Sequence, residues 1–289
     1  MKRERGFTLL ELMVSLSILS VMMAMLVGYV LSMQNHFFND IVRTRINSNL
    51  RSAFDIVGMN IRQTGENLKK SFPAVVLSND LDGAGKYLQL RRNLIPEVLT
   101  VCVNFNAGAT SISVSKNNPT NAACLYSNVT SVYNAFNTER LAKDGNIRMY
   151  IFNSLTKSGE FVDYTGGTSS SNYSLSISPA SANYPADSTY LYLVEEYAFA
   201  LDETEETLNL YRNGKTDTPE AVAFSISAFD VVIKNSDGTE LAVLSPNSST
   251  TWKQIKNISI GLTGTESWKS RDFSTTLNGE FFPRNIISK

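Results

Sequence analysis

An uncharged and mostly apolar run extends from Leu12 to Met33, near the amino terminus. As an α-helix, its 22 residues would be about 33 Å long, which is enough to cross the hydrocarbon core of a bilayer. A buried helix of a soluble protein is usually shorter. A cleavable secretory signal would end in a small-residue site, which residues 34–45 (QNHFFNDIVRTR) do not offer. The pattern therefore predicts a helix that is retained in the membrane.

The charges on either side of this run give a modest orientation signal. Three basic residues precede it, offset by Glu4, and three arginines follow it, offset by Asp40. Cytoplasmic flanks of membrane helices carry an excess of Lys and Arg. Because a short basic flank before a first helix is typically cytoplasmic, we expect residues 40 onward on the outer side of the membrane.

A one-sided hydrophobic stripe follows the uncharged run. Its members recur at spacings of three and four residues: Val42, Ile46, Leu50, Phe54, Val57 and Ile61. This spacing is typical of an amphipathic helix that buries one face, and Gly65 fits a C-terminal stop. The sequence thus predicts one helix from Phe7 to Thr64, roughly 85 Å long. Residues 7–35 would be its apolar membrane part, and residues 36–65 would pack against a folded domain.

Beyond residue 72 the chain changes to short segments that are rich in β-branched and aromatic residues and often alternate apolar with polar. The expected strands are 73–78, 86–90, 97–105, 146–152, 173–178, 189–201, 207–211, 221–233 and 255–263. Turns are expected at Asp82-Gly83, Asn213-Gly214 and Asp237-Gly238, and long surface loops at 106–122 and 165–189. The predicted fold class is α+β: a long N-terminal helix packed on an antiparallel, β-rich head formed by residues 66–289.

Composition constrains the partners. The chain has 26 Lys and Arg against 27 Asp and Glu, so its net charge is −1. Nucleic-acid binding needs a basic face, and because the sequence indicates none, no nucleic-acid partner is expected. The basic pairs Lys69-Lys70 and Arg91-Arg92 are expected to be solvated surface.

Glu11 stands near the start of the apolar helix, where a carboxylate in hydrocarbon costs about 2.5–3.5 kcal/mol or more. One interpretation is a helix cap, because Thr8 to Glu11 fits the capping-box pattern and an acid in the first turn suits the helix dipole. That leaves the basic segment 2–5 and Gly6 unexplained. The other interpretation is cleavage after Gly6, which creates a positive amino group on Phe7 that can pair with Glu11 of the same or a neighbouring chain.

The stretch GFTLLELMVSL at residues 6–16 resembles the class III signal of type IV pilins and of type II secretion pseudopilins. The resemblance implies that prepilin peptidase removes the leader, residues 1–6, by cutting between Gly6 and Phe7 on the cytoplasmic side. It also implies N-methylation of Phe7 and a role for Glu11 in docking one subunit against the next. The cut chain would have 26 − 3 = 23 basic and 27 − 1 = 26 acidic residues, a net charge of −3.

One position departs from the pattern of many major pilins, which have a proline where this chain has Gly28. Glycine weakens a helix by roughly 1 kcal/mol relative to alanine. Local unwinding is therefore allowed there but not required.

The carboxy-terminal part is similar to PilW-type minor pilins. The similarity rests on the segments EEYAFALDETEETLNLYRNG, VAFSISAFDVVIKNSDG and SRDFSTTLNGEFFPRN, and in the last of these on Arg271, Phe273, Ser274, Thr275, Pro283, Arg284 and Asn285. IRQTGENL at 61–68 resembles the family's helix end. The resemblance is strong over 6–35, moderate over 61–68 and 190–287, and absent over 100–185. J-like type II pseudopilins share the same overall plan.

Cys102 and Cys124 lie in the part of the chain without resemblance. Outside the inner membrane they would meet an oxidising compartment, and a single pairing exists. We expect a disulfide, which in the loop-entropy account stabilises the domain by roughly 3 kcal/mol; the alternative is two separate buried thiols. Metal binding is not expected, because the single histidine, His36, lies beside the membrane.

Catalytic signals are missing from the sequence. It has no G-x-S-x-G, H-E-x-x-H or P-loop motif, and one histidine on the anchor helix argues against a Ser-His-Asp triad. NDLDGAG at 79–85 clusters oxygen ligands but lacks the later EF-hand positions, so a hairpin turn is expected there instead of a calcium site. Glu195-Glu196 and the acidic stretch 202–206 are expected to be a solvated strand end and a turn. We expect no enzyme activity and no cofactor.

These inferences predict an inner-membrane protein with a periplasmic head that primes, caps or joins a type IV pilus as a minor pilin. Its expected partners are prepilin peptidase, other minor and major pilins or pseudopilins, and the inner membrane. Three alternatives stay open. The chain could be a J-like pseudopilin at the tip of a secretion pseudopilus, a pilus-tip adhesin that binds through the loops at 106–122 and 165–189, or an outward-facing membrane-anchored enzyme.

Overall fold

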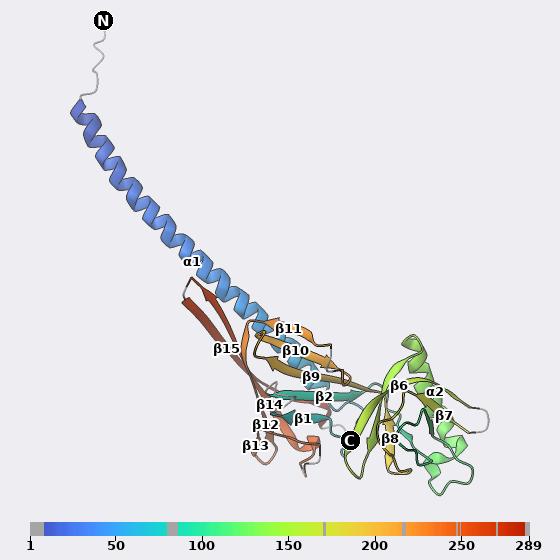
Figure 1. Cartoon of the computed structure of the whole chain (residues 1–289). Coiled ribbons are helices and arrows are strands. Elements are labelled where there is room, and N and C mark those ends of the chain that lie inside the picture. The colour runs from blue at the N-terminus through green and yellow to red at the C-terminus, as the bar shows by residue number, and fades with distance from the viewer. Residues whose placement is uncertain are drawn as a thin grey trace.

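The computed structural model describes residues 9–79, 86–169, 172–215, 218–246, 248, 250–269 and 271–286. It shows a long helix that carries an elongated, β-rich head at one end (Figure 1). The predicted α+β class, with antiparallel sheets following an N-terminal helix, is confirmed.

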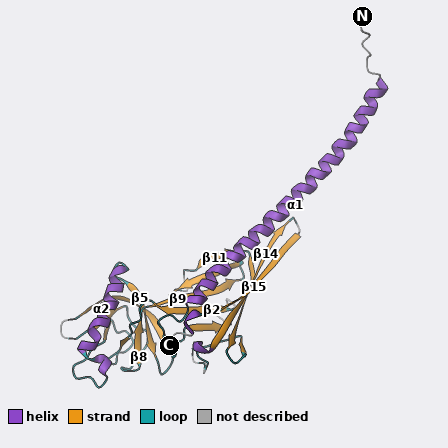
Figure 2. Cartoon of the chain, turned by 180° about the vertical axis from the view of Figure 1, so that it is seen from behind, coloured by secondary structure: helices purple, strands orange, loops and turns teal. Residues whose placement is uncertain are grey.

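Helix α1 runs without interruption over 55 residues, Leu9–Gln63. Its first half extends away from the head, and its second half lies along it (Figures 1 and 2). Five members of the predicted stripe are buried, and Phe54 is half-buried with its ring centroid 4.8 Å from that of Phe281. The one-sided pattern of residues 42–61 therefore forms because this face alone packs against the head.

The helix ends where side chains and backbone from three distant segments converge. Gly65 has φ +80° and donates its N–H to the Arg91 carbonyl at 2.9 Å; a Cβ there would lie 2.1 Å from the Trp252 ring. The Asn285 amide donates to the carbonyls of Gln63 and Thr64, at 3.2 Å each. The two Asn285 bonds give partners to carbonyls that the end of a helix leaves without intrahelical partners.

The sheet nearest the helix contains four strands within the described residues, in the order β13-β12-β14-β15. Their bounds are β12 Ile226–Asn235, β13 Glu240–Leu241, β14 Ile255–Trp268 and β15 Arg271–Phe281. Gly58 of α1 lies against β15 so closely that a Cβ on it would approach the Phe281 ring to 2.2 Å. The absence of a side chain at Gly58 lets helix and sheet meet at this point.

A second sheet, described with five strands, shares its hydrophobic core with α1 and the first sheet. Its order is β1-β2-β9-β10-β11, with β1 Val75–Ser78, β2 Tyr87–Asn93, β9 Val194–Asp202, β10 Thr207–Arg212 and β11 Glu220–Phe224. The short helices η2 Trp252–Gln254 and η3 Arg284–Ile286 contact each other, and η3 also contacts α1. We call these two sheets, with the packed half of α1 and the short helices η2 and η3, the proximal lobe.

The third sheet forms a separate lobe inserted between β2 and β9. As described, its order is β3-β8-β5-β6-β7-β4, with β3 Leu99–Thr100, β4 Ser111–Ser113, β5 Ile147–Asn153, β6 Ser158–Thr168, β7 Ser174–Ile177 and β8 Thr189–Tyr192. Helix α2, Tyr126–Ala142, follows the short helix η1, Ala122–Cys124, and packs on this sheet. The buried residues of the second core cluster all come from 99–193, so this distal lobe has its own core.

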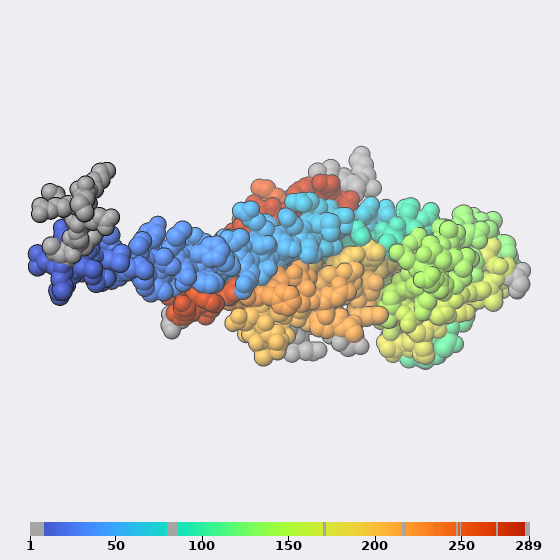
Figure 3. Space-filling view, turned by 90° about the horizontal axis from the view of Figure 1, so that it is seen from above, coloured from blue at the N-terminus to red at the C-terminus, as the bar shows by residue number. Residues whose placement is uncertain are grey.

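The distal lobe lies past the end of α1. The N-terminal half of α1, the proximal lobe and the distal lobe therefore follow one another along the molecule (Figure 3). The chain enters the distal lobe after β2 and returns at Leu193, whose carbonyl accepts the Leu94 N–H at 2.9 Å. The neck between the lobes therefore consists of these two chain crossings and of the Phe72 ring, whose centroid lies 4.8–5.6 Å from those of Tyr150, Phe152 and Tyr192 of the distal sheet.

Several sequence predictions need correction. Residues 189–201 and 221–233 are not single strands: the first divides at Leu193 into β8 and β9, and the second at Ser225 (φ +58°) into β11 and β12. Each pair of strands belongs to two different sheets. The sequence pattern does not reveal these breaks: 189–201 is largely buried on both sides of Leu193, and apolar residues stand on both sides of Ser225, although Phe224 is exposed and Ile226 is buried.

The predicted loops at 106–122 and 165–189 are partly wrong, since β4 and the end of β6 occupy parts of them, whereas β7 matches the strand expected at 173–178. Helix α2 and strands β6 and β15 were also missed. A helical signal was available for α2, because the buried Val129, Tyr133 and Phe136 recur at spacings of four and three. Its Asn, Ser and Thr residues, which are poor helix formers, masked that signal.

Two ion pairs cross the neck side by side. Arg91 of β2 is opposite Glu196 of β9, and Arg92 is opposite Glu195. Because neighbouring residues point to opposite faces of a strand, the first pair is buried, with side chains 7% and 2% exposed, and the second is partly exposed. The prediction that Arg91-Arg92 and Glu195-Glu196 are solvated is therefore wrong for the buried pair.

The buried pair also contacts the distal lobe. Arg91 Nε lies 2.7 Å from Glu196 Oε2, Nη1 donates to the Pro73 carbonyl at 3.1 Å, and the guanidinium lies 4.9 Å from the Tyr150 ring centroid of β5. Burial alone would lower the pKa of Arg91, but Glu196, together with Tyr150 and Tyr87, outweighs that effect and raises the pKa above its usual value. Arg91 therefore stays charged and joins the two lobes.

We expect Glu196→Gln to lower the free energy of unfolding by about 3–5 kcal/mol, because it leaves the buried Arg91 charge without a counter-charge. Chemical denaturation of the purified chain would measure this. The matched control is Glu195→Gln, which breaks the neighbouring, partly exposed pair and should cost about 0–1 kcal/mol. Equal losses in the two variants would contradict the role given to the buried pair.

Candidate functional site

The N-terminal half of α1, residues 9–37, is exposed along its whole length and mostly apolar; we call it the bare half. By length and composition α1 could cross a membrane: its most apolar 18-residue window has a mean hydropathy of 2.2, and none of that window is buried. Large apolar side chains stand in solvent along it, from Leu9, which is 79% exposed, to Met33 and Phe37. Such a contiguous apolar surface marks a contact with membrane or with other proteins.

Polar side chains within this half are arranged to suit an apolar environment. The hydroxyls of Ser15, Ser17 and Ser20 donate to helix carbonyls three or four residues earlier, at 2.5–2.8 Å. A hydroxyl that bonds within its own helix needs no external partner in lipid or between packed helices. The serines therefore do not interrupt the apolar surface.

Glu11 lies in the first described turn of α1 with an exposed side chain. The helix dipole favours a negative charge at this end. Gly6 and Phe7, the predicted cleavage and methylation positions, and Thr8, the predicted capping residue, lie outside the described residues. The two interpretations of Glu11 thus both stay predictions.

The helix continues through Gly28 without a break. A Cβ at this position would meet no atom within 4 Å, since the surroundings are open. The local unwinding that the sequence allows at Gly28 is thus not adopted in this conformation.

A long β-hairpin of the head holds α1 at the point where the bare half begins. The β14–β15 hairpin extends beside the helix toward its N-terminal half (Figure 1). Trp268 stacks on Phe38 with ring centroids 5.1 Å apart, and Arg45 Nη1 lies 2.6 Å from Glu266 Oε1. Charged residues on α1 hinted at such contacts, but the sequence could not indicate which strand would supply the partners.

The structure joins Cys102 and Cys124 by a disulfide, with Cα atoms 5.7 Å apart. Both residues are buried, at 6% and 1% exposure. Cys102 follows strand β3, and Cys124 ends η1 just before α2. The bond therefore ties the start of the distal helix to the distal sheet.

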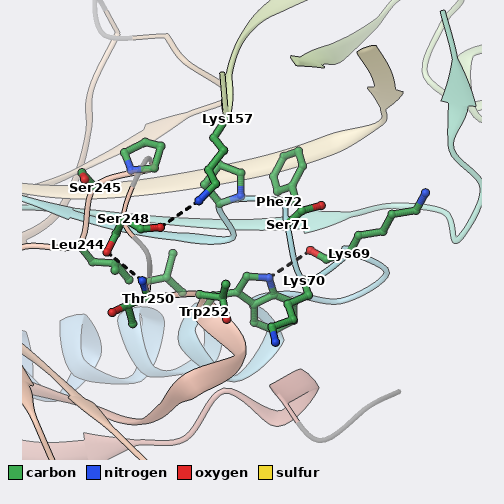
Figure 4. Close-up of a pocket in the computed structure, with 14 residues that line it drawn as sticks. Lys69, Lys70, Ser71, Phe72, Lys157, Leu244, Ser245, Ser248, Thr250 and Trp252 are labelled. Atoms are coloured by element: carbon green, nitrogen blue, oxygen red, sulfur yellow. Dashed lines mark hydrogen bonds between the residues drawn. The ribbon is translucent and has the colours of Figure 1, made fainter. Parts of the chain in front are cut away.

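A crevice of about 470 Å³ is lined by described residues of 69–75 and 244–252 and by Lys157 (Figure 4). Trp252 Nε1 donates to the Lys69 carbonyl at 3.3 Å, and Lys157 Nζ donates to the Ser248 carbonyl at 3.1 Å. Among the described residues that line the crevice there is no histidine, cysteine or carboxylate. Its described walls therefore offer no metal ligand of those types, and lysine is their one ionisable residue type.

Metal binding finds no other support in the part of the chain that is described. No group of three or more His, Cys, Asp or Glu residues is placed to hold an ion there. His36 lies exposed on α1. Most of the NDLDGAG segment, residues 80–85, lies outside the described residues, so the hairpin-turn prediction for it stays a prediction.

Comparison with known proteins gives one match. Residues 1–27 match the prokaryotic N-terminal methylation motif, the class III signal of type IV pilins. No curated protein and no solved structure matches the chain. The motif supports a type IV pilin-like or pseudopilin protein, and proteins with this motif are structural. Together with the apolar half of α1, it fits anchoring in the inner membrane.

We expect loss of the disulfide to destabilise the distal lobe by about 3 kcal/mol, since the bond closes a loop with a sequence separation of 22 residues. The paired variant Cys102→Ser/Cys124→Ser should unfold at lower temperature than the oxidised chain, and a reductant should shift only the oxidised chain. Mass spectrometry of non-reduced peptides, prepared after export to an oxidising compartment, should find the linked pair. Two alkylatable thiols in the folded, exported chain would contradict the bond.

Proposed function

We propose that this protein is a minor pilin that primes or caps a type IV pilus, or is incorporated in it, after cleavage by prepilin peptidase and N-methylation of Phe7. The observation that carries the proposal is the continuity of the methylation motif at 1–27 with a helix that is bare in one half and packed by a head in the other. The bare half would span the inner membrane first and pack among the helices of other subunits later.

Glu11 would guide that transfer. Cleavage after Gly6 leaves a positive amino group at Phe7, four residues before Glu11, and N-methylation keeps the positive charge of that amine. In the apolar interior of a filament, a carboxylate and an ammonium group stabilise each other when they come from adjoining subunits. The exposed position of Glu11 in the first described turn supports such a contact.

The distal lobe supports a place at the end of a filament. It lies past the end of α1, on the side away from the anchor (Figure 3). A subunit within the shaft would need another head in that direction, where this lobe would obstruct it. A first subunit, with nothing beyond it, meets no such obstacle.

A J-like pseudopilin at the tip of a secretion pseudopilus remains the alternative, because the same anchor and plan serve both systems. The PilW-like ending of the sequence favours the pilus. In the structure Asn285 of that ending binds the last carbonyls of α1, and Phe273 lies under the Arg43 guanidinium at 5.6 Å. These residues thus have a physical role in holding the anchor helix.

The position of the distal lobe also favours a second candidate function, that of a pilus-tip adhesin. A lobe with its own core at the far end of the molecule is placed to meet an external surface. Selective binding of the purified chain to an array of glycans would favour this candidate over a purely structural minor pilin.

We expect Gly6→Val to block processing, because a branched side chain crowds the position before the cut. Mass spectrometry of the membrane fraction should then find the full chain instead of a chain that begins at Phe7. Gly28→Ala is the matched control, since its position is remote from the cut and open to added atoms. Normal amounts of mature Gly6→Val protein would refute the cleavage assignment.

We expect Glu11→Gln to be inserted and cut normally but to fail in joining other pilins. Glutamine keeps much of the capping geometry, whose loss would cost about 1 kcal/mol, whereas removal of a buried docking charge typically costs about 3–5 kcal/mol. Co-purification with other minor pilins and counts of pili per cell would measure the effect.

Ser15→Ala is the control for that variant, because the Ser15 hydroxyl bonds only its own helix among the described contacts. It should assemble as the unmodified chain does. If Glu11→Gln assembles equally well, helix capping is a sufficient account of Glu11 and the charge-pairing mechanism fails.

A further inference from the structure

The tip of the β14–β15 hairpin lies at the level where the apolar run of α1 ends. Lys269 Nζ is 3.4 Å from Asn35 Oδ1, and Trp268 stacks on Phe38. Asn35 is two residues beyond Met33, a rise of about 3 Å along the helix. If the apolar run spans a bilayer, the described tip residues stand in the headgroup region of the leaflet on the head's side.

A small hollow opens between the helix and this tip. Its volume is about 200 Å³, and Asn35, Asn39, Trp268, Lys269 and Arg271 line it. Lys269 and Arg271 are exposed, and their side chains are hydrogen-bond donors without an acceptor atom. Two amides and two cations in one hollow suit a phosphate group, whose oxygens accept hydrogen bonds and carry negative charge.

The acidic residues Glu266 and Asp272 near this hollow are bound to other partners and do not neutralise Lys269 and Arg271. Glu266 is paired with Arg45 at 2.6 Å, and Asp272 accepts from the Ser267 hydroxyl at 2.5 Å. Counting Asp40 as well, residues 35–45 and 266–273 contain four Arg or Lys residues and three acids, a net charge of +1. The chain without residues 1–6 has a net charge of −3, so this end of the head is more positive than the protein as a whole.

We propose that the tip of the β14–β15 hairpin is a second membrane contact, in which Lys269 and Arg271 bind the phosphate headgroups of anionic phospholipids. Trp268 would lie at the membrane–water interface, which tryptophan favours. This contact would hold the head against the bilayer and fix the angle of α1 while the subunit waits for assembly. It would break when the helix leaves the membrane. The proposal depends on the proposed function only in requiring that α1 spans the bilayer.

The test uses the full chain reconstituted in vesicles that contain phosphatidylcholine with a nitroxide on its headgroup. The nitroxide quenches a nearby tryptophan, and a Trp268→Phe variant separates the signal of Trp268 from that of the buried Trp252. We expect stronger quenching of Trp268 when phosphatidylglycerol is included than in phosphatidylcholine alone. The increment should decrease at high salt, since exposed charges are screened.

The variant Lys269→Gln/Arg271→Gln should lose the increment that depends on phosphatidylglycerol. The control Lys116→Gln/Lys143→Gln removes two positive charges from exposed positions of the distal lobe and should keep the increment. Thermal unfolding of the four-protein set, including Trp268→Phe, would check that each variant is folded. Lys269 and Arg271 are both exposed, so the change of these residues to glutamine should leave folding unaffected.

Flotation of the vesicles separates this proposal from the proposed function. If the chain floats with the vesicles but quenching of Trp268 is absent, or is unchanged by phosphatidylglycerol or by Lys269→Gln/Arg271→Gln, the headgroup contact is refuted and the anchor stands. If the chain fails to float, the membrane span is refuted, and the headgroup contact with it.

Discussion

The rest of the structure depends on one helix with two different surroundings. Along residues 42–61 of α1 one face is buried against two sheets, and along residues 9–37 nothing in the described chain covers the apolar side chains. Exposing so large a contiguous apolar surface to water is unfavourable, so we expect lipid or neighbouring helices to cover it. The folded chain is in this sense an incomplete unit. The proposed function, in which α1 leaves a membrane for the interior of a filament, would require this incompleteness.

The head holds the other half of α1 through contacts at several points along the helix. The β14–β15 hairpin contacts α1 near Phe38 and Arg45, and Asn285 binds its last carbonyls. Between these points Gly58 permits close contact with the sheet. Forces applied to the helix are therefore transmitted to the head over the whole packed half instead of at a single linker.

The neck extends the same rigidity to the distal lobe. Two strands joined in register, β2 and β9, bring Arg91 and Glu196 together, and Arg91 also meets the Tyr150 ring of the distal sheet. A buried charge pair contributes little net stability, because both ions lose their hydration when they are buried. Its contribution here is directional: together with the ring contacts of Phe72, the hydrogen-bonded guanidinium joins the distal sheet to the β2–β9 pair.

The sequence by itself determined the anchor and the class of fold. Hydrophobic periodicity depends on local geometry, so the change from an apolar run to a one-sided stripe at Val42 was readable, as were the β-rich head and the motif around Gly6, Phe7 and Glu11. Only the tertiary structure divided the runs at Leu193 and Ser225 between sheets, buried Arg91 against Glu196 and brought Trp268 to Phe38. The contacts join residues that are far apart along the chain, and each break depends on the backbone at a single residue. No periodic pattern within one segment records which distant segment will pack against it.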